Sequence, residues 1–142
     1  VVSLFSAVTG ISGFLYGLIT RRLGIRFTLS FAGLAMAAGC AMMIDVRDAP
    51  DAYLAAVVFG MGLGGLLTIP PLAWADYFGR KSFGAIRGVA LSAQVTAQAC
   101  GPMISAVLRD WTGDYVLSLQ VFAAISVLAA LIIWIARPPA RA

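Results

Sequence analysis

The sequence predicts an all-α membrane protein with five transmembrane helices, and three observations carry that prediction. Hydrophobic residues make up 61% of the 142 residues and charged residues only 11%, with a mean hydropathy of +0.95, whereas a soluble domain has about 25% charged residues. The charges fall in short clusters between long uncharged runs, and the number of cations in successive clusters alternates between high and low. Lipid is therefore the expected solvent.

Five uncharged runs have the length of a membrane helix. A helix rises about 1.5 Å per residue, so about 20 residues cross a hydrocarbon core of about 30 Å. Backbone groups must be paired inside lipid, and a charge at the bilayer centre costs roughly 2.5–3.5 kcal/mol, so each run is expected to be a helix free of Asp, Lys and Arg. The predicted spans are residues 1–20, 27–44, 52–75, 88–108 and 115–136.

The charges between these spans predict an orientation. The four connections and the tail hold three, one, three, one and two cations in chain order. Positive-inside bias places the first and third connections and the C-terminal tail in the cytoplasm, and the N-terminus outside. The chain begins at Val1 without an initiator Met, and a span begins at its first residue. We therefore expect a fragment of a longer protein with further helices upstream.

The residue inventory argues against several classes of function. The chain has no His and no Glu, and Cys40 and Cys100 lie far apart in apolar runs, so we expect buried thiols and neither a metal site nor a disulfide framework. No G-x-S-x-G motif and no nucleophile with an accompanying base occurs, so an enzyme is not expected. The cations lack an aromatic platform, which argues against a nucleic-acid partner.

The stretch GMGLGG, residues 60–65, matches the glycine pattern of a dinucleotide-binding turn. That turn requires a preceding strand and an acidic residue about 20 residues later, and neither is expected for a stretch inside a membrane span. Small residues let neighbouring membrane helices approach closely, here Gly60 and Gly64 in the third span and Gly13 and Gly17 in the first. These glycines are therefore predicted to pack helices.

The first predicted cytoplasmic connection resembles a known family motif. Gly17-x-x-x-Arg21-Arg22-x-Gly24-x-Arg26 is similar to the signature loop of the major facilitator superfamily, G-x-x-x-D-R-x-G-x-R. Gly17, Arg22, Gly24 and Arg26 match this pattern. Arg21 departs from it, because the family has Asp at that position.

The resemblance extends over nearly the whole chain. Residues 70–88 resemble the link between the tenth and eleventh helices of these carriers, and residues 101–115 resemble the end of the eleventh helix and its outer turn. Five helices with an outside start and an inside tail correspond to helices eight to twelve, in the C-terminal half of the fold. A weaker resemblance points to carriers of monocarboxylates and related organic anions.

The resemblance implies a function and partners. It implies part of a secondary active transporter that moves a small organic solute by alternating access, without a cofactor. Its partners would be the lipid bilayer, the solute and the missing N-terminal helices of the same protein. We expect an integral membrane protein, in the inner (plasma) membrane of a bacterium, with its C-terminus in the cytoplasm. The third helix would line the cavity, the first and fourth would help to gate it, and the second and fifth would be peripheral.

Polar residues in the spans are candidates for the substrate cavity. Gln94 and Gln98 are four residues apart and therefore share one face of the fourth helix. They either form hydrogen bonds between helices, or face the cavity and hold a solute carboxylate or hydroxyl group. Thr68 in the third helix is the other cavity candidate.

Three prolines are candidates for helix kinks, namely Pro70 and Pro71 in the third helix and Pro102 in the fourth. Each removes a backbone hydrogen bond and opens the carbonyl four residues earlier, so the helix should kink or unwind there. Two interpretations stay open. The kinks either shape the bundle only, or they make a cavity wall that bends during transport.

Asp76 is the only acidic residue assigned to the cytoplasmic side. It is either a solvated charge or a partner of Arg80, or it pairs with Arg21, Arg22 or Arg26. Such a pair would restore the carboxylate that the signature lacks at position 21, and would close the cytoplasmic side of the carrier.

A second function class stays open beside the transporter. The chain is then a membrane scaffold or assembly protein that retains the fold without transport, and its signature-like loop serves only to pack helices. No charged residue is predicted at mid-membrane depth, so a proton relay would require residues from the missing helices. Solute uptake by the complete protein distinguishes the two classes.

Overall fold

Helices make up almost all of the described chain. The computed structural model describes residues 2–135, and residues 77–82 by their backbone alone. The helices are α1 (Val2–Leu23), α2 (Ile25–Ile44), α3 (Ala49–Thr112) and α4 (Val116–Ile135). No strand occurs within this part of the chain. The prediction of an all-α protein is confirmed.

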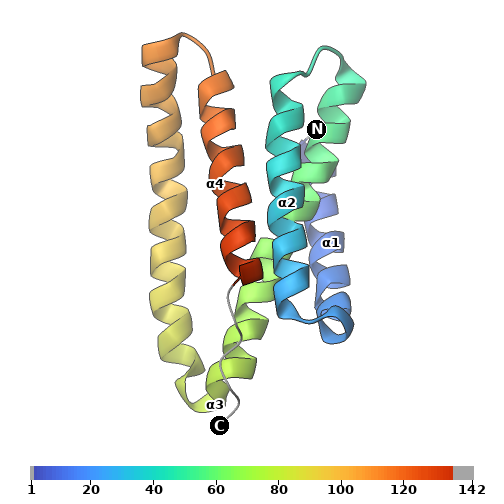
Figure 1. The fold of residues 1–142 in the computed structure, drawn as a ribbon, viewed down its shortest axis with the longest axis vertical. Coiled ribbons are helices and arrows are strands. Elements are labelled where there is room, and N and C mark those ends of the chain that lie inside the picture. The colour runs from blue at the N-terminus through green and yellow to red at the C-terminus, as the bar shows by residue number, and fades with distance from the viewer. Residues whose placement is uncertain (1, 136–142) are drawn as a thin grey trace.

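The 64 residues of α3 contain both the third and the fourth predicted spans. Figure 1 shows that α3 folds back on itself, so that it forms two arms that run in opposite directions. The first arm is Ala49–Asp76, and we call residues 83–112 the second arm. The sequence predicts a connection between these spans, because cations and glycines gather there. The structure corrects this detail: the link is itself helical, since charged residues are compatible with a helix once it leaves the lipid.

Tight turns at glycine residues join α1 to α2 and α3 to α4. Gly24 lies between α1 and α2 with a φ of 85°, and Gly113 lies between α3 and α4 with a φ of 83°, a conformation that strains any residue with a Cβ atom. The Gly113 amide donates a hydrogen bond to the Arg109 carbonyl at 2.7 Å. We call the end of the bundle where α1 turns into α2 the Gly24 end, and the end where α2 turns into α3 the Asp48 end (Figure 1).

Four stretches of the described residues are long and apolar enough to cross a membrane. They are α1, α2, the first arm of α3 and α4, and they correspond to four of the five predicted spans, with ends that differ by a few residues. The second arm, which holds the remaining predicted span, is not among them. Its Gln94 and Gln98, together with nearby hydroxyl residues, lower its hydropathy. The protein is an integral membrane protein in which the second arm of α3 is more polar than the other membrane-length segments.

The first arm of α3 packs between α1 and α2, and α2 packs against α4 on another side. The core of this bundle joins three helices through Tyr16 of α1, Ala32 of α2 and Ile69 of α3, all of them buried. The second arm makes few contacts with α4 and stands apart from the bundle (Figure 1).

The glycines of residues 60–65 make close packing possible. A Cβ atom on Gly64 would lie 2.6 Å from the carbonyl oxygen of Thr9 in α1, and a Cβ atom on Gly62 would lie 2.7 Å from the Cα atom of Met36 in α2. Both distances are shorter than van der Waals contact, which is about 3.5–4.0 Å between carbons. One glycine stretch therefore admits a helix on each side, and the prediction that these glycines pack helices is confirmed.

Candidate functional site

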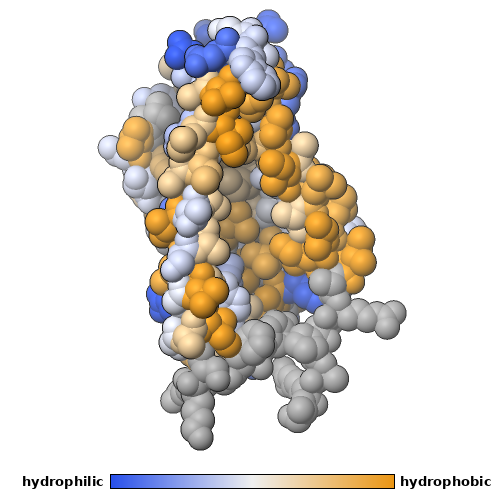
Figure 2. Space-filling model, turned by 90° about the vertical axis from the view of Figure 1, so that its left-hand side faces the viewer, coloured by the Kyte–Doolittle hydropathy of each residue, from blue (hydrophilic) through white to orange (hydrophobic). Residues whose placement is uncertain are grey.

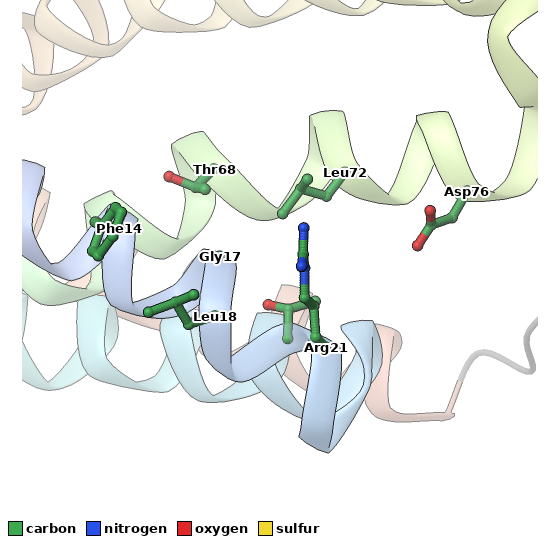
Figure 3. Close-up of a pocket in the computed structure, with 9 residues that line it drawn as sticks. Phe14, Gly17, Leu18, Arg21, Thr68, Leu72 and Asp76 are labelled. Atoms are coloured by element: carbon green, nitrogen blue, oxygen red, sulfur yellow. The ribbon is translucent and has the colours of Figure 1, made fainter.

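A cavity of about 500 Å³ lies between α1 and the first arm of α3 (Figure 3). Small, apolar and charged residues line it in turn from the middle of the bundle towards the Gly24 end. The lining residues are Gly13, Phe14, Gly17, Leu18, Thr20 and Arg21 from α1, and Thr68, Leu72 and Asp76 from α3.

Two glycines of α1 make room for the inner part of this cavity. A Cβ atom on Gly13 would lie 2.8 Å from Oγ1 of Thr68, and one on Gly17 would lie 4.0 Å from Cγ2 of Thr68. Thr68 is partly buried, and a side chain larger than hydrogen at position 13 would press on it. The structure thus places Thr68, a sequence candidate, on the cavity wall opposite Gly17 of the signature-like loop.

The charged residues of the cavity lie near the Gly24 end. Figure 3 shows Arg21 reaching from α1 towards α3, with the Asp76 carboxylate further along α3 on the side that faces α1. Both residues line the same cavity and both are exposed. The structure forms no ion pair between Asp76 and Arg21, Arg22 or Arg26, all of which belong to the described residues. The pairing hypothesis remains a prediction.

The other residues of the signature-like loop have different surroundings. Arg22 is exposed, and Gly24 makes the turn between α1 and α2. Arg26 is half-buried, and its Nη2 donates a hydrogen bond to the carbonyl oxygen of Trp134 in α4. Sequence reasoning missed this partner, because 108 residues separate the two positions and no local pattern links them.

The second arm carries the two amide candidates, outside the α1–α3 cavity. Gln94 is partly buried and Gln98 is exposed. The neighbouring hydroxyl groups are satisfied within the helix, since Ser92 donates to the Gly88 carbonyl at 3.0 Å and Thr96 donates to the Ser92 carbonyl at 2.8 Å. Figure 2 shows pale and bluish side chains among the orange ones on the face of the molecule that includes this arm. The structure does not bring Gln94 and Gln98 together with Thr68.

The α-helix continues through all three prolines. Pro70 and Pro71 follow Thr68 in the first arm, are partly buried and do not line the cavity, whereas Pro102 is exposed on the second arm. Since the helix does not unwind, the remaining expectation is a kink, because the carbonyls of residues 66 and 67 lose their helical donors.

Sequence reasoning also missed the apolar walls of the cavity. Phe14 and Leu18 are four residues apart on α1, and Leu72 lies four residues from both Thr68 and Asp76 on α3. Residues four apart share one face of a helix. The spacing of four residues between Thr68, Leu72 and Asp76 therefore predicts that one face of this helix carries a hydroxyl, an apolar and an acidic side chain.

The lining of this cavity includes one acidic residue, Asp76, and neither of the two cysteines. Across the residues that the structure describes, no group of three or more His, Cys, Asp or Glu side chains lies close enough to hold a metal ion. Cys40 is buried, as expected, but the expectation of a buried thiol is wrong for Cys100, which is exposed on the second arm. That arm contacts too little of the bundle to cover it.

The comparisons with known proteins give one match. A family model described as the Major Facilitator Superfamily matches residues 1–142, the whole chain. Searches of curated proteins and of solved structures found no match. The family match thus agrees with the resemblance of the signature-like loop.

Proposed function

The chain belongs to the Major Facilitator Superfamily, and from this premise we propose that it forms part of a secondary transporter that moves a small organic solute by alternating access. The observation that carries the proposal is the cavity of about 500 Å³ between α1 and α3, which joins an apolar wall to a cation, an anion and a hydroxyl group. Ligand sites in proteins are of this kind, mostly apolar with a few polar groups. A solute path would begin there.

The second arm of α3 supports an aqueous path beside this cavity. Lipid cannot satisfy a side-chain amide, and the hydroxyls next to Gln94 and Gln98 are already used within the helix. An exposed amide in a membrane therefore favours water, a solute or another helix as its neighbour. We assign Gln94 and Gln98 to the solute path as neutral donors, so carboxylate-bearing solutes such as monocarboxylates are the first class to assay.

The charges at the Gly24 end support a gate. Positive-inside bias places this end and the C-terminus in the cytoplasm, and the bacterial inner membrane is the proposed location. Arg21 replaces the family's acidic residue, and Asp76 offers a carboxylate across the same cavity. In the proposed cycle, Asp76 pairs with Arg21 or Arg22 when the cytoplasmic side is closed, and the first arm bends at Pro70 and Pro71 when it opens.

Charge exchange tests the transporter and its gate together. Asp76→Arg should lower solute uptake into proteoliposomes about tenfold, within the usual range of coupling free energies, since it puts two cations on one cavity. Adding Arg21→Asp or Arg22→Asp should recover part of that loss. The matched control is Asp51→Arg, an exposed acid at the Asp48 end, which should change uptake by less than about twofold.

Two outcomes would overturn this proposal. Wild-type protein that takes up no organic anion, sugar, amino acid or drug from a broad panel would favour the scaffold, which the departure at Arg21 also favours. Uptake that neither exchange partner restores would remove the gate and leave the transporter.

The orientation has a test of its own. Reporter tags placed at Asp48 and at Ser82 should report opposite compartments, because one span separates the two positions. A shared compartment would contradict the proposed threading of the chain.

A further inference from the structure

Helices α2 and α4 meet along one narrow face. Arg26, Ser30 and Gly33 are spaced by four and three residues on α2, so they lie on one side of that helix. Ser30 donates a hydrogen bond to the Ala130 carbonyl at 3.1 Å, and a Cβ atom on Gly33 would lie 3.1 Å from the Cβ atom of Ala130. Arg26 donates to the Trp134 carbonyl one turn further along α4.

The contact of Arg26 supplies a donor that α4 itself lacks. The structure describes α4 as far as Ile135, and the residue four positions after Trp134 is Pro138. Proline has no backbone N–H, so the usual helical donor to the Trp134 carbonyl does not exist. The guanidinium of Arg26 takes its place, whereas Ser30, Gly33 and Ala130 at the same interface have small side chains.

The position of Arg26 separates it from the cavity charges. It is half-buried, and its Nε is buried with no hydrogen-bond partner among the described atoms. Arg21 lines the α1–α3 cavity with Asp76, and Arg26 does not. Two arginines of one signature-like loop therefore point at different helices.

We propose that Arg26 is a positioning residue that fastens α4 at the Trp134 carbonyl to the start of α2, so that the two helices move as one rigid pair, and that Arg26 takes no part in pairing with Asp76. The small residues set how closely the helices approach, and the guanidinium fixes their register at the Gly24 end. Only the claim about a moving pair rests on the proposed transport function.

Hydrogen exchange on the whole protein in detergent tests the fastening without any transport assay. Arg26→Gln should raise exchange of the amides in residues 129–135 by about fivefold or more, because the Trp134 carbonyl loses its donor and this part of α4 opens more often. Arg26→Lys keeps a charge and a donor, and should give less than half of that increase. Arg22→Gln removes a charge from the same loop and should leave residues 129–135 unchanged.

Three exchange results would overturn the fastening. Arg26→Gln could leave residues 129–135 unaltered, Arg26→Lys could match Arg26→Gln, or Arg22→Gln could produce the same increase. The first result shows that the bond does not hold α4. The second and third show that the effect does not come from the guanidinium at position 26.

A double-mutant cycle tests the separation from the gate. The effects of Arg26→Gln and Asp76→Asn on uptake should multiply within about twofold, as for independent sites. The effects of Arg21→Gln and Asp76→Asn should fail to multiply if these two residues pair. A non-multiplicative effect of Arg26 with Asp76 would place Arg26 in the gate and overturn its assignment to α4.

A crosslink tests the rigid pair. Ser30→Cys with Ala130→Cys, in a background that lacks other cysteines, should form a disulfide, and the oxidised protein should keep at least about half of its uptake because the two positions need not separate. Uptake that falls on oxidation and returns on reduction would show that the helices must part, and would overturn the pair. Since exchange needs no solute, failure of the transport proposal would leave the fastening test intact.

Discussion

The two arms of α3 are consecutive parts of one helix, yet they meet very different surroundings. In the first arm, Cβ atoms added to Gly62 and Gly64 would collide with α2 and α1. In the second arm, Cβ atoms added to Gly84, Gly88 and Gly101 would meet nothing within 4 Å. The first arm is apolar enough to span a membrane by itself, whereas the second does not reach that level.

This difference indicates that the two membrane-length arms of α3 have different roles, which follow from the polar content of each arm. The first arm exchanges lipid contacts for close contacts between helix backbones. Within a membrane the hydrophobic effect does not drive helices together, so this close packing is what stabilises the bundle. The second arm keeps amides that lipid cannot satisfy. Its role therefore depends on water, solute or further helices, which fits the solute path proposed above.

The largest expected effect separates the glycines of the two arms. Gly62→Ala should lower the free energy of unfolding by about 1–3 kcal/mol, because the added methyl group would press on backbone atoms of Met36. Backbone atoms within a helix cannot move aside as the end of a flexible side chain can. Gly88→Ala is the matched control on the second arm. It should be neutral or stabilising by up to about 1 kcal/mol, because alanine favours a helix and meets no neighbour there.

Thermal unfolding in detergent, with the fraction of monodisperse protein as a second readout, measures both variants. Equal stability of the two alanine variants would mean that the close approach of α2 to the first arm does not persist in the folded protein. The contrast between the arms would then have no energetic basis.

The next effect concerns function in the second arm. Gln98→Leu should reduce solute uptake about tenfold or more, since a hydrogen bond to a charged group contributes about 1.5–3 kcal/mol, while the unfolding temperature stays the same or rises. Gln94→Leu should act in the same direction because the two residues share a face. Val89→Leu is the control, because Val89 lies five and nine residues from the two glutamines and therefore on the opposite face of this arm. Uptake that survives both leucine variants would indicate that the amides face other helices.

Sequence reasoning predicted the fold well where the chemistry is local to the chain. The lack of charges in the spans follows from the cost of burying a charge in lipid, and the role of the glycines in residues 60–65 follows from the absence of a strand before them. The face formed by Thr68 and Asp76 was equally readable. These features depend on a few neighbouring residues, so periodicity and composition are sufficient to find them.

Sequence reasoning failed where a residue has a distant partner in the chain, where exposure depends on tertiary structure, or where a helix continues past the end of a membrane span. Arg26 matched a signature loop, but its hydrogen-bond partner Trp134 lies 108 residues away. Cys100 sits in an apolar run, and only the spatial separation of the second arm leaves it exposed. The helical link near Arg80 reads as a loop, because charge marks where the lipid ends and not where the helix ends.

A smaller effect tests the cavity wall beside the first arm. Gly13→Ala should cost about 1 kcal/mol of stability, because the methyl group would lie 2.8 Å from Oγ1 of Thr68. Thr68→Ala in the same protein should relieve most of that cost by removing the hydroxyl. A double-mutant cycle on unfolding temperature measures the coupling. Strictly additive costs would contradict the contact between these two positions.

The smallest effect compares two serines, one in each setting. Ser12 of α1 donates to the Thr9 carbonyl at 3.1 Å and also lies 3.4 Å from the Gly60 carbonyl of the first arm. Ser92 of the second arm donates only within its own helix among the contacts of the described residues. Ser12→Ala should therefore cost about 0.6 kcal/mol, the average for interhelical hydrogen bonds in membranes, and Ser92→Ala should change stability by less than about half of that. Ser12 is buried and Ser92 is exposed, so Ser12→Ala should cost more stability than Ser92→Ala. A larger loss for Ser92→Ala would show that another helix packs against the second arm at Ser92. The distinction between a packed arm and a polar arm would then no longer hold.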